Sequence, residues 1–397
     1  MSEQKGLTSK RKSILIIAPR VPFPLDAGGK IAIYSAIEAI SNHFNVFLVI
    51  VTDEQVTKVQ VESMGSISKE CKVFYFSKSK CRINTVKSLY NRLPLQTNYF
   101  YHSKVQDYVN ELSPHIDFGY SFMIRTSAYF NNFPKFKVIN FIDSLYLSYS
   151  RSVAQTSSLL WKIIYGYEIK ILKKYELKCI KDFDKNIFVN SNEASYWANY
   201  APNVHCLPFG VEQSIIEYDK IDHSYKDSII FLGKMDYQPN IDAVQWFCEK
   251  VMTKMSDYIR LIIVGGSPSK EVRELPQKYK NVKVTGFVED PYAMIRGCIA
   301  VVAPMQTGGG LQTKVLTAMA LGAKVIAPKW VIEPVPGARI NFNILVSEEP
   351  EEYAKLVMDI YQNPSNFIDI GENARHTALE KFSWVHYQTE NLRLFNE

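Results

Sequence analysis

The chain has 397 residues, which is enough for roughly two to four domains of ordinary size. Its composition is 47% hydrophobic and 22% charged, with 18 glycines and 18 prolines, and this excludes a disordered or collagen-like protein. The net charge of +6 is too small to indicate nucleic acid as a partner. The charge is unevenly distributed, however, because residues 1–212 carry 26 lysines and arginines against 17 acidic residues, whereas residues 213–397 carry 20 against 23.

The amino-terminal region and the cysteines indicate a compartment. The apolar run at residues 14–17 is shorter than the roughly 7–15 residues of a signal-peptide core, and no stretch approaches the roughly 18 apolar residues of a membrane span. Six cysteines occur without C-x-x-C pairs, which favours free thiols in a reducing compartment over disulfides or a zinc site. We therefore expect a cytoplasmic protein, either soluble or located at the inner face of the cell membrane.

Short apolar, β-branched runs alternate with helical patterns along the chain. Such near-continuous apolar strands are typical of parallel sheets that are covered by helices on both faces. Eleven runs exceed one comfortable sheet, so we expect two α/β domains, residues 1–212 and 213–383, with the junction in the polar stretch at residues 204–226. The predicted strands are 13–18, 46–51, 72–76, 137–142, 186–190, 227–232, 260–264, 282–284, 299–303, 324–327 and 343–346.

The first candidate site is the turn after the first predicted strand. Gly28 and Gly29 directly precede a helical pattern at residues 31–40, so backbone N–H groups and the helix N-terminus could bind an anion there. The pattern is neither G-x-G-x-x-G nor a P-loop, which argues against a dinucleotide or ATP. A simple glycine turn is the alternative interpretation.

A second candidate site follows the buried strand that ends at Pro304. Three consecutive glycines, Gly308, Gly309 and Gly310, cost backbone entropy without any gain in packing, which indicates a functional loop. An amphipathic helix follows from about Leu311, and its first turn suits a diphosphate because free N–H groups and a lysine coincide there. This first turn contains Gln312, Thr313 and Lys314.

A third candidate site lies in residues 231–240, where Gly233 and Lys234 come directly after a predicted strand. Lys234 can reach the same phosphates if its strand lies beside the strand that ends at Pro304. A solvated surface lysine is the alternative interpretation.

At these residues the sequence resembles the family 4 retaining glycosyltransferases of the GT-B fold, most closely their bacterial polysaccharide-assembly branch. Each motif alone indicates the family only weakly, but their occurrence together and in this order is specific for it. The motifs that carry the resemblance are residues 22–30, 143–144, 175–176, 231–244, 264–266, 285–292, the Gly308 loop with its helix, and 382–384.

The resemblance implies an α/β protein with two Rossmann-like, doubly wound domains that face each other across a cleft. The N-terminal domain would bind the acceptor and the C-terminal domain a nucleotide-diphosphate sugar, UDP- or GDP-linked, with no other cofactor. We expect no metal, because a metal site would need an Asp-x-Asp cluster after a strand, and Asp182 and Asp184 instead precede theirs. A C-terminal helix, residues 384–397, would return to the N-terminal domain. The family assigns the diphosphate to Lys234 and Lys314 with the backbone at Gly28, Gly29, Gly233 and Gly308–Gly310, the neighbourhood of the transferred sugar to Asp143, and the base to the backbone of Gly286, Phe287 and Val288.

The sequence departs from the family at two positions. The family commonly carries two glutamates eight residues apart, one beside the sugar and one on the nucleotide ribose, and here those positions are Gly309 and Thr317. A threonine hydroxyl can make one hydrogen bond to a ribose but not the bidentate contact of a carboxylate. A non-catalytic protein that binds sugar nucleotides or glycans therefore remains an alternative, as does a GT-B epimerase or phosphorylase, although neither set of catalytic residues for these is evident.

The predicted function is metal-independent glycosyl transfer, with retention of configuration, to a glycan or a lipid-linked saccharide in bacterial surface polysaccharide synthesis. Residues 159–178 combine lysines and aromatic residues at helical spacing, and residues 90–101 are rich in aromatic residues. Such a basic amphipathic segment can lie on an anionic membrane. It can equally pack its apolar face on the N-terminal sheet.

Overall fold

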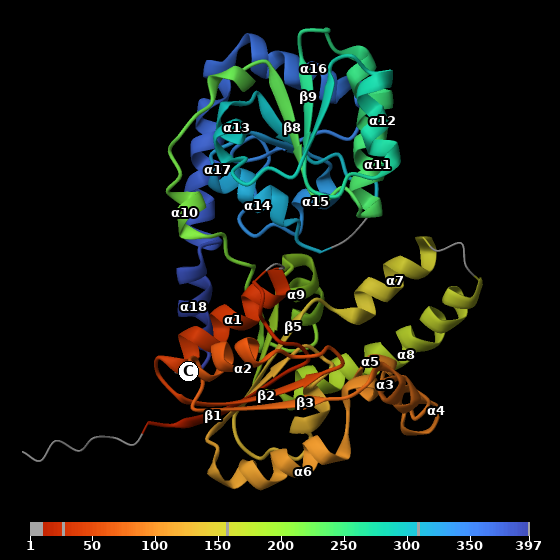
Figure 1. The fold of residues 1–397 in the computed structure, drawn as a ribbon, viewed down its shortest axis with the longest axis vertical. Helices are drawn as coiled ribbons and strands as arrows, with labels where there is room; N and C mark the ends of the chain where they lie inside the picture. Colours follow the sequence, from red (N-terminus) through yellow and green to blue (C-terminus); the bar gives the residue numbers. More distant parts are fainter. Residues whose placement is uncertain (1–10, 26–27, 156–158, 308–309, 396–397) are drawn as a thin grey trace, which may run out of the picture. The chain divides into compact units, whose positions relative to one another are not determined.

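The computed structural model describes residues 11–25, 28–155, 159–307 and 310–395 (Figure 1). The chain divides into two compact units. The first unit comprises residues 1–189, 193–207 and 387–397, and the second comprises residues 190–192 and 208–386. Each unit is built around one parallel sheet with helices on both sides of it (Figure 1).

The first unit contains a seven-stranded parallel sheet in the order β3-β2-β1-β4-β5-β6-β7. The third strand in this order, β1, is completely buried from Ile14 to Ala18, which explains the uninterrupted apolar run in the sequence. The strands are β1 (Ser13–Ala18), β2 (Asn45–Thr52), β3 (Glu70–Tyr75), β4 (Phe118–Phe122), β5 (Lys137–Ile142), β6 (Lys185–Phe188) and β7 (Val204–Cys206).

Two of these strands, β4 and β7, are absent from the sequence prediction. Strand β4 contains Gly119, and a Cβ atom at this position would lie 2.6 Å from the ring of Phe130, so close packing requires the residue that weakens the strand pattern. Strand β7 has only three residues, Val-His-Cys, and lies at the edge of the sheet, so it forms no apolar run that the sequence pattern could reveal.

The second unit contains a six-stranded parallel sheet in the order β10-β9-β8-β11-β12-β13. The order of its strands repeats that of the first six strands of the other unit, and it is the order of a Rossmann fold. All six strands were expected from the sequence. They are β8 (Ser228–Leu232), β9 (Arg260–Val264), β10 (Val282–Gly286), β11 (Ala300–Val302), β12 (Val325–Ala327) and β13 (Leu345–Val346).

Helices connect the strands and cover both sheets. The first unit has α1 (Gly28–Ser41), α2 (Lys58–Gly65), α3 (Lys78–Thr85), α4 (Ser88–Asn91), α5 (Leu95–Phe100), α6 (Ser103–Leu112), α7 (Leu145–Gln155), α8 (Leu159–Asp182) and most of α9 (Ser191–Ala198). The second unit has α10 (Gln213–Ile216), α11 (Gln238–Trp246), α12 (Lys270–Lys278), α13 (Tyr292–Gly297), α14 (Thr313–Ala320), α15 (Lys329–Ile332), α16 (Pro350–Gln362) and α17 (Ile368–Lys381). None of the helices in the described ranges is long and apolar enough to cross a membrane.

The last helix, α18 (Trp384–Arg393), returns to the first unit from Tyr387 onward, as the sequence resemblance implied (Figure 1). The hydroxyl of Tyr387 donates to the carbonyl of Ala32 in α1, at 3.3 Å. The hydroxyl of Tyr120 in β4 donates to Asn391 Oδ1, at 2.7 Å, and both side chains are buried. These buried hydrogen bonds fix the helix to the sheet, because breaking one would leave a polar group unsatisfied in the core.

Candidate functional site

The second unit places its candidate site at the point where the strand order reverses. Strands β8 and β11 are neighbours, and their connections leave in opposite directions across the sheet. Lys234 follows β8 by two residues, and Met305 follows β11 by three. Ligands of open α/β sheets bind outside the carboxyl ends of the strands at such a switch point.

A pocket of about 590 Å³ opens at this edge and brings together four residues that were singled out in the sequence: Gly233, Lys234, Phe287 and Val288. The ring of Phe287 is 80% exposed, which is unusual for a phenylalanine and leaves an aromatic face available to a planar ligand. The remaining lining residues are Leu232, Val264, Gly265, Gly266 and Ser267.

Glycines allow the backbones to approach closely at the base of this pocket. A Cβ atom at Gly265 would lie 1.8 Å from the carbonyl oxygen of Gly233, so no other residue fits there. Gly286 has φ = +73° at the end of β10, directly before Phe287. The pocket therefore exposes main chain that a ligand can contact without interference from side chains.

Lys314 is the buried cation of this site. Its side chain is only 9% exposed, and Nζ donates to Asn240 Oδ1 at 2.5 Å and to the sulfur of Met305 at 3.4 Å. Nζ also lies 4.6 Å from the centre of the Phe231 ring. Within the described ranges no carboxylate lies within ion-pair distance of Nζ, and burial lowers the pKa of Lys314 to about 8. A buried cation that is surrounded by neutral groups destabilises the folded protein unless an anion pairs with it.

Lys234 differs from Lys314 in its surroundings, although the family resemblance implies the same role for both lysines. Its side chain is 70% exposed and forms an ion pair with Asp236 at 3.2 Å. The backbone of Lys234 is tied to the buried lysine through Asn240, whose Nδ2 donates to the Lys234 carbonyl oxygen at 2.8 Å. Asn240 thus links the two lysines, and sequence reasoning missed this role even though the residue lies in the segment that carries the resemblance.

The other predicted residues of this loop lie around the start of α14. Gln312 directly precedes the helix, Thr313 is its exposed first residue, and Thr317 lies one turn after Lys314 and is partly buried. Gly310 has φ = +73°. Gly308 and Gly309 lie outside the described residues.

In the first unit, α1 begins at Gly28, three residues earlier than predicted, so Gly28 and Gly29 form the first turn of the helix. The first N–H groups of a helix have no intrahelical acceptor. These two groups, together with Asp143, belong to the first unit, whereas the lysines belong to the second.

Asp143 is the first residue after β5. Its side chain is solvent-accessible, but the protein that surrounds it and the negative charge of Glu193 raise its pKa to about 6, and Arg151 offsets part of that effect. Arg151 forms an ion pair with Glu193 Oε1 at 2.8 Å. The carboxylate of Glu193, which lies near Asp143, is therefore already paired with Arg151.

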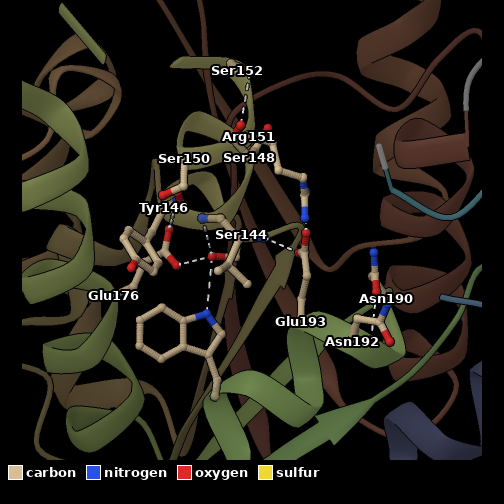
Figure 2. Close-up of polar contacts among 12 residues, drawn as sticks. Ser144, Tyr146, Ser148, Ser150, Arg151, Ser152, Glu176, Asn190, Asn192 and Glu193 are labelled. Atoms are coloured by element: carbon tan, nitrogen blue, oxygen red, sulfur yellow. Dashed lines mark hydrogen bonds and ion pairs between the residues drawn. The ribbon is translucent and has the colours of Figure 1, made fainter. Parts of the chain in front are cut away.

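The next residue, Ser144, is the centre of a buried hydrogen-bond network (Figure 2). Its hydroxyl donates to Glu176 Oε2 at 2.5 Å and accepts the indole N–H of Trp197 at 3.2 Å. Its backbone N–H donates to Glu193 Oε2 at 2.6 Å. The backbone N–H of Tyr146 donates to Glu176 Oε1 at 2.9 Å. These bonds join β5, α7, α8 and α9 behind Asp143.

Glu176 is fully buried in this network, and burial raises its pKa to about 8, although the hydrogen bonds from Ser144 and Tyr146 favour the charged form. Both of its oxygens already accept a hydrogen bond from the protein. Its position is that of a structural group that holds the Asp143 turn in place.

The other residues that could take part in catalysis or bind a metal do not form a common site. His102 is buried, stacks on the ring of Phe76 with 3.5 Å between ring centres, and has its pKa lowered to about 4 by burial. The described part of the chain contains no group of three His, Cys, Asp or Glu side chains that could hold a metal ion.

Comparison with known families and proteins gives one family match. Residues 226–363 match the family described as "Glycosyl transferases group 1", and this range contains both lysines and the pocket beside them. Over an alignment of 411 residues the chain is 22% identical to an uncharacterized 44.6 kDa protein in the cps region of Klebsiella pneumoniae, which covers 96% of this chain and 98% of that protein. The residues that match this family thus lie within the second unit.

Solved structures resemble the chain over nearly its whole length. The Anabaena protein Alr3699/HepE, crystallised in complex with UDP, has a TM-score of 0.66 and 13% identity, covering 97% of this chain and 99% of that chain. WaaG, a glycosyltransferase involved in lipopolysaccharide biosynthesis, has a TM-score of 0.64 and 13% identity, covering 97% of this chain and 100% of that chain. These likenesses confirm the predicted fold class, two Rossmann-like domains of the GT-B type.

Proposed function

We propose that the protein is a glycosyltransferase that moves a sugar from a nucleoside-diphosphate donor to a glycan or lipid-linked saccharide in bacterial surface polysaccharide synthesis. The observation that carries this proposal is Lys314, a buried ammonium without a carboxylate partner in the described ranges, beside a glycine-lined pocket with an exposed aromatic ring. A diphosphate supplies the missing anion, and Phe287 offers its face to the base. The group 1 match and the UDP complex of the Anabaena protein support a nucleotide donor.

In the proposed reaction, the bond between the anomeric carbon and the diphosphate oxygen breaks while the acceptor oxygen bonds to the same carbon. The acceptor attacks from the side of the departing diphosphate, so configuration is retained, and a phosphate oxygen takes the proton of the acceptor hydroxyl. Negative charge grows on the leaving diphosphate. Lys314, Lys234 and the backbone N–H groups at the start of α14 stabilise this charge, and Lys314 is already held in place by its hydrogen bonds before the reaction begins.

Calorimetric binding of nucleotides tests the donor site. We expect UDP or GDP to bind more tightly than the matching monophosphate, and we expect Lys314→Ala and Lys234→Ala to weaken the diphosphate selectively without unfolding the protein. Lys270→Ala is a matched control, since Lys270 is an exposed lysine of the same unit. Wild-type affinity and turnover in both lysine variants would refute the donor site.

A second candidate function is a non-catalytic protein that binds sugar nucleotides or glycans. Thr317 favours it, because this residue replaces a glutamate that the resembling family places on the nucleotide ribose. Incubation with UDP-, GDP-, dTDP- and CMP-sugars distinguishes the two. A transferase hydrolyses one of these donors slowly even without an acceptor, whereas a binding protein retains the donor intact.

We further propose that the first unit binds the acceptor next to an anionic membrane surface. Helices α3, α4 and α8 expose Ile83, Leu89, Tyr90, Trp161 and Ile163, and Leu89 is 74% exposed. The same three helices and their connections carry many lysines and arginines, and a pocket of about 400 Å³ between the end of α4 and α8 is lined by Arg92, Lys170, Lys174 and Lys178. Exposed apolar side chains with flanking cations suit an anionic lipid interface.

Co-sedimentation with vesicles tests this surface. The wild-type protein should sediment with phosphatidylglycerol vesicles at low salt and not with phosphatidylcholine vesicles, and Leu89→Ser together with Ile163→Ser should reduce the bound fraction. Val385→Ser is a control at another exposed apolar residue. No sedimentation with the anionic vesicles at low salt would contradict membrane binding.

A further inference from the structure

The first unit has a switch point of its own, and it carries two arginines. Strand β1 neighbours β4, Arg20 follows β1 by two residues, and Arg125 follows β4 by three. A pocket of about 350 Å³ opens beside them at the end of β2. The lining residues are Asp53, Thr85, Leu95, Gln96, Tyr99, Phe100 and Arg125.

Arg125 lines this pocket, and its guanidinium has no ionic partner in the part of the chain that the structure describes. Its Nε donates to Gln96 Oε1 at 2.6 Å, and the group lies 5.4 Å from the centre of the Phe100 ring. Within the described ranges no carboxylate lies within 4 Å of its nitrogens. Burial, reinforced by the nearby charge of Arg20, lowers the pKa of Arg125 to about 10, so the side chain remains a cation at neutral pH.

The turn that carries Arg125 is rigidly held. Met123 has φ = +62°, and its N–H donates to the carbonyl of Asn140 at 2.7 Å. The hydroxyl of Thr126 donates to the carbonyl of Phe122 at 2.8 Å and lies 3.2 Å from that of Ile17 in β1. The guanidinium is therefore positioned before any ligand arrives, which reduces the entropic cost of binding.

The other residues that line the pocket suit a sugar ring. Asp53 accepts the hydroxyl of Tyr99 at 2.7 Å and retains oxygen lone pairs that can accept a sugar hydroxyl. Phe100 and Leu95 supply apolar surface. Glu168 accepts the N–H of Leu95, and burial raises its pKa to about 7, so near neutral pH this carboxyl group is partly protonated and carries less than a full negative charge.

We propose that this pocket binds an anionic group of the acceptor, a phosphate or a carboxylate, through Arg125 with Arg20 nearby, while Asp53 accepts a hydroxyl of the attached sugar. This inference rests on the proposed glycosyltransferase function and names the chemical class of its acceptor. A planar guanidinium with unfilled donors matches the oxygens of either anion bidentately. The anion has two sources, the diphosphate of a lipid-linked saccharide or the carboxylate of an acidic sugar.

Ligand titration monitored by NMR tests the proposal with four soluble probes. Methyl glucuronide is compared with methyl glucoside, and geranyl diphosphate is compared with geraniol, so each anion has a neutral counterpart. We expect at least one anion to bind more tightly than its counterpart, and we expect Arg125→Gln to weaken that anion by about tenfold, the effect of one charge-assisted pair of hydrogen bonds. Preference for the glucuronide identifies an acidic sugar, and preference for the diphosphate identifies a lipid carrier.

Controls separate this pocket from folding and from the donor site. Arg11→Gln removes the same charge at the amino end of β1, the opposite edge of the sheet, and should bind all probes as the wild type does. Arg125→Lys should retain part of the affinity because it keeps the charge but loses the planar fork. UDP affinity is measured on every variant, so failure of UDP to bind the wild type counts against the proposed function alone. Equal binding of each anion and its neutral counterpart, or wild-type binding by a folded Arg125→Gln variant, overturns the proposal.

Discussion

The two units each bury an ionisable side chain near the carboxyl edge of their sheet, Glu176 in the first and Lys314 in the second, and the hydrogen bonds of the two groups are satisfied differently. In the first unit both oxygens of Glu176 accept hydrogen bonds from the protein, from Ser144 and from the Tyr146 N–H. In the second unit Lys314 has one amide oxygen, one thioether sulfur and the face of an aromatic ring around a group that carries three donors. The contrast separates an ionisable group whose hydrogen bonds the fold completes from one whose donors the fold leaves available for a ligand.

The substitution with the largest expected effect is Lys314→Met, which tests whether the fold keeps Lys314 available for a ligand. Methionine keeps the length and the apolar stem of the lysine side chain. Removing a buried charge that lacks an ionic partner should leave the thermal midpoint unchanged or raise it. Binding of the preferred nucleoside diphosphate should weaken about 30- to 150-fold, since a buried charged hydrogen bond contributes about 2–3 kcal/mol. Calorimetric titration and differential scanning calorimetry on the same samples measure both effects.

The matched variant Glu176→Met should show the opposite pattern, with reduced stability and an unchanged nucleotide affinity. It leaves the hydroxyl of Ser144 and the N–H of Tyr146 without their acceptor in the core. If Lys314→Met destabilises the protein as much as Glu176→Met does, the lysine is a structural residue and the contrast fails.

Phe287 provides the next largest test, because it separates recognition of the base from recognition of the diphosphate. Its ring is 80% exposed, so Phe287→Ala should not change stability. Stacking of a base on an aromatic side chain contributes about 1–3 kcal/mol, which predicts roughly a 10-fold loss of affinity for UDP and for UMP alike. The control is Ile340→Ala, at another exposed apolar residue of the same unit. A loss confined to the diphosphate would contradict a role for this ring in base binding.

Titration sharpens the comparison further, since the pKa of Glu176 is raised to about 8 by burial. Between the ordinary carboxyl value and about 8 the folded state binds more protons than the unfolded state, so Glu176 makes local stability fall as pH rises through this range. The fall should approach about 1.4 kcal/mol per pH unit and should be absent in Glu176→Gln, which does not titrate. Hydrogen exchange of peptides from α7 and α8, corrected for the intrinsic rate at each pH, measures it. Identical pH profiles in the two proteins would show that Glu176 is charged throughout.

The alternation of apolar runs and helices predicts most of the architecture, because parallel strands that are buried on both faces must be apolar throughout. It fails at β4, where close packing against Phe130 requires Gly119, and this failure also hides the switch point of the first unit. Arg125 follows β4 and was therefore not singled out, although Arg20 lies in the turn after the first predicted strand.

The sequence identifies the residue types of the candidate site but not their burial or their hydrogen-bond partners. Lys234 and Lys314 both follow glycines, yet one is exposed and paired with Asp236 whereas the other is buried against Asn240. Burial is a property of tertiary packing, and the spacing of residues along the chain contains little of it. The family resemblance implies that both lysines belong to the site, and the structure shows that only Lys314 is buried.

The smallest expected effect concerns Thr317, which lies one turn after Lys314 on α14. In the resembling family a glutamate at this position contacts the nucleotide ribose, so Thr317→Glu should add a charge-assisted contact that the threonine hydroxyl cannot make. Part of this gain is offset by repulsion between the new carboxylate and the diphosphate, so we expect UDP affinity to rise only about threefold, or less than 1 kcal/mol. Thr317→Gln, of equal length and neutral, is the control, and uridine without phosphates should gain more than UDP because it lacks the repulsion. Should uridine bind Thr317→Glu no better than the wild type, the ribose lies elsewhere, and the base and diphosphate would have to account for nucleotide binding without this turn of α14.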